Sequence, residues 1–317
     1  MNQKDDLYMV VPYFNFYNNN YRENNLKDFL NKYKNLNNLK IILVEGISDN
    51  LYGLEDLSKE LFKHIKYNCT QKIWVKENLI NLGIKNCLPT DWKYVSWVDA
   101  DVIFVGKKWV DKTLNALKNF DVVQMFDLAF LLDMDGLKIN KIDDQSKIFE
   151  GFHLSYFNLK ENSLEISKAL DKPIKDIYGC TGYAWAITKD FYNKIVKLWD
   201  YNIVGGGDTL IVDCIDNENF SSPFYSEKFK TQFLEYKRNF EGCKASFIKQ
   251  NIVCRWHGST ESKAYAERHT LLKNSNFDAS QIGYDEYGVI FLKDEKTTKD
   301  IEHYMFSRET FNKVDKN

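Results

Sequence analysis

Residues 94–104 of this chain read Tyr-Val-Ser-Trp-Val-Asp-Ala-Asp-Val-Ile-Phe. The apolar run 94–98 predicts a buried β-strand, and two carboxylates, Asp99 and Asp101, follow it directly. Alternation along an extended chain places both carboxylates on the same side of the backbone, where like charges repel and resist burial. A divalent cation between them and a diphosphate would remove this conflict. The alternative interpretation is a surface turn after a strand, where Asp is common.

The segments before this stretch alternate between apolar strands and amphipathic helices. We expect strands at 7–11, 39–44 and 72–75, with the first ended by Pro12, and helices at 22–33, 54–65 and 76–83. Strand and helix in alternation are typical of a parallel sheet that is covered on both faces. The sequence therefore predicts an α/β fold with a mostly parallel central sheet flanked by helices.

Ligands of such sheets bind beyond the carboxyl ends of the strands. Three groups of residues are expected at those ends: Pro12, Tyr13 and Phe14, then Glu45, then 99–101. Their shared location indicates a binding site more strongly than any one motif does.

The rest of the chain also contains expected helices and strands, and it shows no linker and no repeat. Expected helices lie at 109–117, 162–170, 189–199, 209–215 and 229–240, expected strands at 121–125, 151–158, 183–187 and 252–256, and an expected loop at 133–146. We divide one compact unit into halves at 1–106 and 107–293. A charged tail, 294–317, is expected to be a surface helix or partly disordered.

Composition excludes several classes of function. With 317 residues, 44% of them hydrophobic, the chain can bury a large core. The net charge of -2 favours neither nucleic acid nor an anionic membrane as a partner. No apolar run is long enough to predict a membrane-spanning segment, and the polar start does not resemble a secretion signal. The six scattered cysteines indicate reduced thiols, so we expect a cytoplasmic protein.

A glycine run, Gly205-Gly206-Gly207, directly precedes Asp208 and an apolar helix. Glycines let the backbone adopt angles closed to other residues and let a ligand approach closely. Asp208 is then either an ordinary helix cap or a catalytic base.

Two further residues are candidates for binding. His257 follows an expected strand, and its imidazole would complete, with two Asp side chains, a mixed O,O,N ligand set suited to Mn²⁺. A structural role for this histidine is the alternative. Trp185 stands among small residues, so we interpret its ring as a platform for a sugar rather than as core.

Taken together, these segments of the sequence resemble GT-A-fold nucleotide-sugar glycosyltransferases. The resemblance rests on an ordered series of segments over residues 7–285: 12–15 (Pro-Tyr-Phe-Asn), 44–45 (Val-Glu), 74–81 (Trp-Val-Lys-Glu-Asn-Leu-Ile-Asn), 97–101 (Trp-Val-Asp-Ala-Asp), 182–186 (Gly-Tyr-Ala-Trp-Ala), 205–208 (Gly-Gly-Gly-Asp), 256–259 (Trp-His-Gly-Ser) and 265–268 (Tyr-Ala-Glu-Arg).

The resemblance implies a site for a UDP-sugar donor, which the half 1–106 would bind while 107–293 shapes the acceptor site. It implies a metal, Mn²⁺ or Mg²⁺, held by Asp99, Asp101 and His257, and Asp208 as the catalytic base. The implied donor-binding residues are Pro12, Tyr13, Phe14, Asn15, Glu45, Lys76, Asn81, Asp99, Ala100, Asp101, Trp185, Gly206, Gly207 and Lys263. Lys263 and Asn78 depart from the pattern, since an Arg is expected at each; a lysine still offers a cation to the diphosphate but loses bidentate geometry.

The sequence thus predicts a metal-dependent glycosyltransferase of the hexosyl- or N-acetylhexosaminyltransferase class. Transfer to an acceptor hydroxyl by single displacement would invert the anomeric carbon; retention of its configuration is the alternative. The acceptor would be a glycan, a protein or a lipid-linked saccharide. One alternative is a sugar-nucleotide pyrophosphorylase, which usually has a glycine-rich basic loop where this chain has residues 12–15. Another is a protein of the same fold that binds glycan or nucleotide without turnover.

Overall fold

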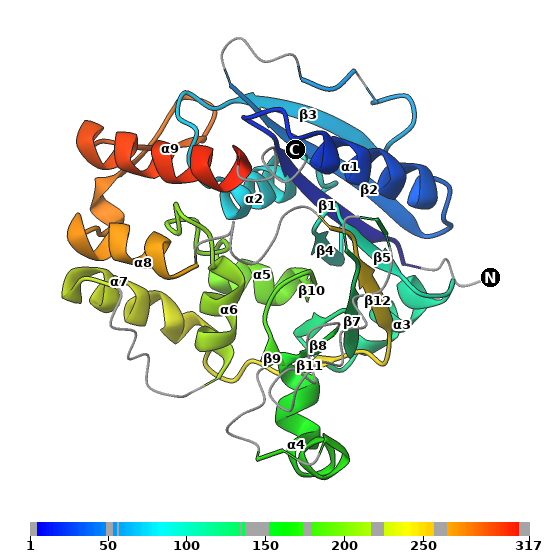
Figure 1. Cartoon of the computed structure of the whole chain (residues 1–317). Helices are drawn as coiled ribbons and strands as arrows, with labels where there is room; N and C mark the ends of the chain where they lie inside the picture. The colour runs from blue at the N-terminus through cyan, green and yellow to red at the C-terminus, as the bar shows by residue number, and fades with distance from the viewer. Residues whose placement is uncertain are drawn as a thin grey trace.

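The computed structural model describes residues 5–48, 53–55, 57–133, 135–136, 152–170, 172–173, 179–216, 225–256 and 265–310. Figure 1 shows a sheet crossing the molecule, with helices packed against both of its faces. The expected α/β architecture, with a mostly parallel central sheet flanked by helices in one compact unit, is confirmed.

Across the described residues the central sheet has seven strands. In spatial order they are β11 (Ala245–Phe247), β6 (Val122–Gln124), β10 (Ala184–Thr188), β4 (Tyr94–Val98), β1 (Leu7–Phe14), β2 (Leu39–Ile47) and β3 (Lys63–Asn68). The strands β3, β2, β1 and β4 are parallel, as is the pair β11 and β6. β10 runs antiparallel between β4 and β6, and so joins the strands of the two halves into one sheet.

β1 continues through Pro12, which we expected to end it. Pro12 pairs with Val44 of β2, but β4 pairs with β1 only from Leu7 to Val10. One edge of β1 is therefore open at Pro12, where the missing N–H removes no ladder hydrogen bond. The last residues of β1 therefore carry their side chains to the carboxyl end of the sheet.

A smaller second sheet lies beside the first. In spatial order its strands are β5 (Val102–Phe104), β12 (Asn251–Cys254), β7 (Leu128–Leu131), β8 (Phe152–Ser155) and β9 (Gly179–Cys180), and a separate hairpin pairs β13 (Ile282–Tyr284) with β14 (Ile290–Leu292). β5 follows the two carboxylates of the opening stretch, so the chain leaves the central sheet at the end of β4 and enters the second sheet after three intervening residues.

The described helices are α1 (Asn20–Tyr33), α2 (Lys76–Cys87), α3 (Trp109–Ala116), α4 (Tyr156–Leu170), α5 (Lys189–Ile195), α6 (Gly207–Ile215), α7 (Glu227–Lys237), α8 (Tyr265–Asn274) and α9 (Glu295–Thr310), with 3₁₀ turns at Arg238–Phe240 and Ala279–Gln281. Polar caps begin several of them: Asn19 accepts from the amide of Tyr21, and Ser226 accepts from that of Phe229.

Two apolar cores lie on the two faces of the central sheet. Side chains of β1 alternate between them: Val10 faces one core, while Met9 and Val11 face the other. The first core includes residues of α2, α5, α6, α7 and α9, and the second includes residues of α1, α3 and the second sheet. No helix in the described part of the chain is long and apolar enough to span a membrane.

Residues 156–158, expected to end a strand, instead begin α4, and three expected elements differ more widely in the structure. The segment 54–65 is not a helix; its end joins β3, which pairs with β2 along Lys63–Asn68. The segment 72–75 is a loop rather than a strand, with Ile73 and Val75 buried in the first core. Residues 295–310 form α9, which buries Ile301 and Met305. The proposed loop 133–146 lies largely outside the described residues.

Candidate active site

The centre of the candidate site is a buried lysine that joins two carboxylates. Lys76 begins α2, and its Nζ lies 2.7 Å from Oδ1 of Asp99 and 2.9 Å from Oδ2 of Asp208. Burial lowers the pKa of this ammonium, but Asp208 and Asp99 outweigh burial and raise the pKa above its ordinary value. Lys76 is therefore charged, and it fixes the positions of two acids that lie far apart in the sequence.

Asp99 is held at the end of β4 from two sides. Its backbone amide donates to the carbonyl oxygen of Tyr183 at 2.9 Å, and Tyr183 adopts a φ of 79°, a conformation rare for a side chain of this size. Burial raises the pKa of Asp99 to about 6; Lys76 opposes that shift, and Asp208 and Asp101 add to it. Strained backbone and a shifted carboxyl group in one place are typical of functional sites.

The glycine run brings Asp208 to Lys76. Gly205 and Gly206 have φ values of 89° and 94°, which glycine adopts without strain. Gly207 begins α6, and a Cβ there would lie 2.2 Å from Oε1 of Glu77, so this position has no room for a larger residue. Asp208 then stands in the first turn of α6, where the helix dipole favours a carboxylate.

A pocket opens beside these charged groups at the carboxyl ends of β1 and β4. The lining residues are Pro12, Tyr13, Phe14, Arg22, Asn25, Trp74, Lys76, Asp99, Ala100, Asp101 and Arg308. The structure thus brings together the expected end of β1, the start of α2 and the two carboxylates. Asp208 reaches this pocket through its ion pair with Lys76.

A second hollow shares Tyr13 with this pocket and is lined by Asn15 and Glu45. The Glu45 carboxylate accepts from the amide of Leu54 at 2.9 Å and lies 3.1 Å from Nε2 of His64. Nδ1 of His64 accepts from the amide of Leu57, so Nε2 carries the proton and donates to Glu45. The buried Glu45 side chain is therefore held in place by these hydrogen bonds and forms part of the wall of the hollow.

Asn15 fixes the loop between β1 and α1. Its Oδ1 accepts from the amide of Asn19 at 2.8 Å, and its Nδ2 donates to the carbonyl oxygen of Asn19 and to the Tyr13 hydroxyl. The rim that carries Tyr13 is therefore held by hydrogen bonds within the loop.

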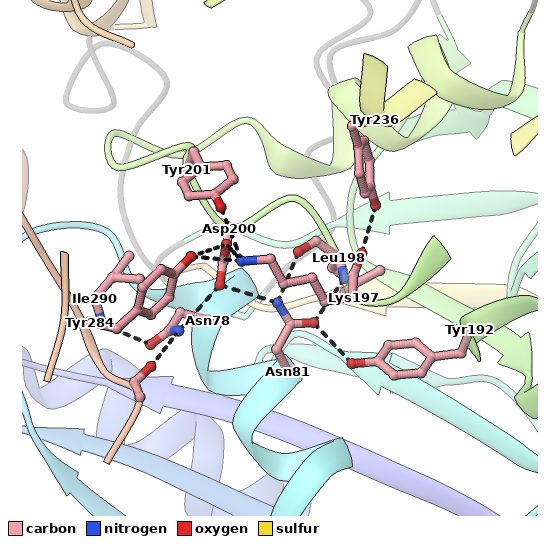
Figure 2. Close-up of polar contacts among 11 residues, drawn as sticks. Asn78, Asn81, Tyr192, Lys197, Leu198, Asp200, Tyr201, Tyr236, Tyr284 and Ile290 are labelled. Atoms are coloured by element: carbon pink, nitrogen blue, oxygen red, sulfur yellow. Dashed lines mark hydrogen bonds and ion pairs between the residues drawn. The ribbon is translucent and has the colours of Figure 1, made fainter. Parts of the chain in front are cut away.

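Asn81 does not lie in the pocket, which corrects the expectation that it stands near a donor. Figure 2 shows it in a hydrogen-bonded network with Asp200, Leu198 and Tyr192, none of which lines the pocket. Its side chain pairs with the backbone of Leu198, with both hydrogen bonds at 2.9 Å, and accepts from the Tyr192 hydroxyl. Asn78 joins the same network through Asp200. Both asparagines tie α2 to the segment after α5.

Trp185 is also placed differently from the expectation that its ring carries a sugar. Its side chain is fully buried in β10, with the ring stacked on Trp97 at 6.4 Å between centroids. Its Nε1 donates to the carbonyl oxygen of Thr181. The small neighbours that suggested a platform leave room for core packing instead.

Two expected ligands, His257 and Lys263, lie outside the described residues. The described chain before them ends at Trp256, and the amide of Arg255 donates to the carbonyl oxygen of Asp101 at 2.9 Å. Asn25 of the pocket donates to the carbonyl oxygen of Trp256 at 3.0 Å. Within the described residues, no group of three or more His, Cys, Asp or Glu side chains is placed to hold a metal.

Sequence reasoning missed Arg22 and Arg308, which both line the pocket. Arg308 stands in the last turn of α9, in the segment that we expected to be a charged tail. A signal for it exists in the sequence: Ile301, Tyr304, Met305 and Arg308 have the spacing of one helix face, and all four are buried. That spacing predicts a packed helix whose buried face includes an arginine.

Comparisons with known proteins give weak likenesses. No protein-family model matches the sequence, and neither does any curated protein. Among solved structures, residues 1–349 of S. aureus TarS align with a TM-score of 0.42 and 11% identity, over 98% of this chain and 73% of that chain. A mannosyltransferase from Pyrobaculum calidifontis, in complex with GDP-Man and Mn²⁺, gives a TM-score of 0.41 and 12% identity, with coverages of 99% and 71%.

A 4-diphosphocytidyl-2C-methyl-D-erythritol synthase from Anaerococcus prevotii DSM 20548 gives a TM-score of 0.35 and 13% identity, over 95% of this chain and 99% of that chain. At these values the likenesses do not decide an activity, and a function has to follow from the chemistry of the site.

Proposed function

We propose that this protein is a glycosyltransferase that moves a sugar from a nucleoside-diphosphate sugar, a UDP-sugar, to the hydroxyl of an acceptor. One observation carries the proposal: Asp99 and Asp208, from distant segments, meet on the ammonium of Lys76 beside a pocket at the strand ends. Parallel sheets bind nucleotides at this end. Transfer from a diphosphate would use a pair of carboxylates to hold a metal and a further carboxylate as a base. Asp99 and Asp101 would form the pair, and Asp208 would be the base.

The residues present fit a divalent cation. Asp99 and Asp101 line one pocket and offer the carboxylate oxygens that Mg²⁺ and Mn²⁺ prefer. The hydrogen bond from Arg255 to Asp101 supports His257, two residues farther along the chain, as the third ligand. A bound cation would supply positive charge to the diphosphate as it leaves.

The second hollow supports a place for the nucleoside. It adjoins the pocket at Tyr13 and is walled by Asn15 and the buried Glu45. A donor lying across both hollows would place its nucleoside against β1 and β2 and its diphosphate near 99–101. Gly206 and Gly207, beside Asp208, would then contact the sugar of the donor.

Asp208 is the base in this proposal. Lys76 holds its Oδ2, and no hydrogen bond among the described residues uses its Oδ1. The acceptor oxygen forms a bond to the anomeric carbon and gives its proton to Asp208. The bond between that carbon and the diphosphate oxygen breaks, and the nucleoside diphosphate takes the electron pair. A single displacement of this kind inverts the anomeric carbon.

The first test screens the protein against UDP-sugars with Mn²⁺ or EDTA and with an acceptor panel, measuring released UDP. We expect Asp208→Asn to lower turnover by about 10²- to 10⁴-fold, because the base is lost, while UDP binding by calorimetry stays within about twofold. Asp101→Ala should weaken metal-dependent UDP binding.

Asp213→Asn is the matched control, since it makes the same change on the same helix, α6, at a residue that does not line the pocket. An Asp208→Asn variant that keeps most of its turnover would overturn the assignment of the base. Tight UDP binding without turnover on any acceptor would favour a binding protein of this fold. If the protein binds no nucleoside diphosphate with metal present, the proposed function is wrong.

A further inference from the structure

Arg308 is a buried cation in the candidate pocket that the proposed reaction has not yet used. It stands in the last turn of α9, and it lines the pocket together with Asp99, Asp101 and Trp74. Only 7% of its surface is exposed. Arginine is seldom buried to this degree unless its charge and its N–H groups have partners.

The guanidinium of Arg308 makes two contacts within the described residues. Its Cζ lies 4.9 Å from the ring centroid of Trp74, so the cation stacks on an aromatic face. Its Nε lies 4.0 Å from Oε1 of Glu309. Arg22 already binds that carboxylate with two hydrogen bonds, of 2.9 and 2.6 Å. Glu309 is therefore shared, and Arg22 is its stronger partner.

One nitrogen of the Arg308 guanidinium has no acceptor within the part of the chain that the structure describes. Nη1 is buried and makes no hydrogen bond among the described residues. A buried donor without a partner destabilises the folded protein, and more so when the donor is charged. Such a group in a pocket wall indicates a ligand with an anionic oxygen.

The supports of Arg308 are themselves held in place. The Trp74 amide donates to the carbonyl oxygen of Ile203, and the Trp74 ring nitrogen donates to Glu77. On α9, Glu302 accepts from the Lys72 amide through its side chain and from the Tyr17 hydroxyl through its backbone. The guanidinium is therefore positioned before any ligand arrives, which reduces the entropy lost on binding.

We propose that Arg308 binds the diphosphate of the nucleoside-diphosphate donor, so that the last turn of α9 forms part of the donor site. This inference rests on the proposed function and names a residue for it. A planar guanidinium offers paired N–H donors that match phosphate oxygens, and stacking on Trp74 leaves its edge free to donate. The site then has a cation for the diphosphate that does not depend on Lys263.

The test compares two ligands that differ in the diphosphate. UDP binding is measured by calorimetry with Mn²⁺, and uridine binding by NMR titration, for the wild type and Arg308→Gln. We expect UDP to bind about 10- to 100-fold more weakly to the variant, since a charge-assisted hydrogen bond is lost, and uridine to bind within about twofold of the wild type.

Two further variants separate binding from folding. Arg308→Lys keeps the charge and loses the planar fork, so its UDP affinity should fall between those of the wild type and Arg308→Gln. Lys299→Gln removes the same charge from an exposed position on α9, where Lys299 pairs with Glu295, and should leave both ligands unaffected.

Three outcomes would contradict the inference. Equal UDP binding by Arg308→Gln and the wild type would show that Arg308 does not touch the diphosphate. Parallel losses for UDP and uridine would show a structural role. A wild type that binds uridine but no nucleoside diphosphate would overturn the proposed function itself and this inference with it, whereas the first two outcomes leave the proposed function standing.

Discussion

Glu77 is a buried acid that lies under the glycine run without reaching the pocket. Its Oε2 accepts from the Trp74 ring nitrogen at 3.1 Å, and its Oε1 lies against Gly207. Burial raises the pKa of Glu77 to about 8, although Lys76 opposes the shift. At neutral pH the carboxyl group is therefore protonated, so it packs against the loop without adding a charge beside Asp208.

This raised pKa makes stability depend on pH. An unfolded glutamate titrates near about 4.3, so between about pH 4.3 and 8 the folded protein holds a proton that the unfolded chain has lost. The contribution of Glu77 to the free energy of unfolding is fully present below that range and is lost as the pH rises towards 8. Glu77→Gln removes this titration, since the amide resembles the protonated acid.

We expect the free energy of unfolding of Glu77→Gln, relative to the wild type, to increase with pH between 5.5 and 8, by as much as about 1.4 kcal/mol per pH unit. Urea denaturation at three pH values measures it. Glu227→Gln, at an exposed acid, is the control and should give a difference that does not change with pH. A constant difference for Glu77→Gln would show that its carboxyl group stays ionised.

Residues of the candidate site could be predicted from sequence where strand ends placed them. Pro12 to Phe14 end one strand of the sheet, and Asp99 and Asp101 follow a parallel one; such ends converge on one edge whatever the packing details. The predicted donor-binding roles of Asn81 and Trp185 do not match the structure, because packing details matter for them. Whether a polar or aromatic side chain faces a pocket or the core depends on neighbours such as Leu198 and Trp97.

At the scale of elements, the end of α5 is a strained turn. Val196 has a φ of 69° and ψ of -45°, and the Lys197 amide donates to the carbonyl oxygen of Ile195 at 2.8 Å, which closes a γ-turn. A β-branched residue is rare in this conformation. The network of Figure 2 holds the turn in place, because Lys197 binds Asp200 at 2.6 Å and accepts from Tyr236 through its carbonyl oxygen.

Val196→Gly should relieve that strain. The side chain is 73% exposed, so little packing is lost. Strain of about 1–3 kcal/mol is removed, against an entropy cost for glycine of about 0.5–1 kcal/mol, and we expect a net stabilisation of about 1 kcal/mol by urea denaturation. Val196→Ala shortens the side chain without freeing the backbone and is the matched control. If Val196→Gly is less stable than Val196→Ala by the full entropy cost of glycine, the turn stores no strain.

The element that sequence analysis misassigned most clearly is β3. Its apolar residues continue a helical spacing, while Lys63, Lys66 and Asn68 are exposed charged or polar positions that do not suggest a strand. β3 is the edge of the central sheet, and β2 is its one partner among the described strands. Lysines are common on such edges because they prevent pairing with another chain, so the edge loses the pattern that identifies inner strands.

At the scale of the whole molecule, α9 connects the last part of the chain to the first. Tyr17 donates to the backbone of Glu302, and Arg22 of α1 binds Glu309. Ile301, Tyr304 and Met305 are buried in the first core. The segment that looked like a charged tail therefore packs as part of the fold.

Deletion of 294–317 should destabilise the protein by several kcal/mol, since each buried apolar side chain of α9 contributes about 1.5–3 kcal/mol. Thermal and urea denaturation measure the loss. Deletion of 311–317 is the control, because it leaves α9 complete and should keep the stability close to that of the full chain. If the longer deletion unfolds at the same denaturant concentration as the full chain, α9 contributes no stability.

The position of Arg308 also sets when the donor site can form during synthesis. The carboxylates of Asp99 and Asp101 leave the ribosome before Arg308 does. Arg308 is the last of the described lining residues in the sequence, and its codon follows that of Asp101 by 207 codons. At about 5–20 residues per second, translation needs roughly 10–40 s to cover that distance. A nascent chain thus displays its acidic strand end during that interval, and the pocket cannot be complete before residue 308 has been made.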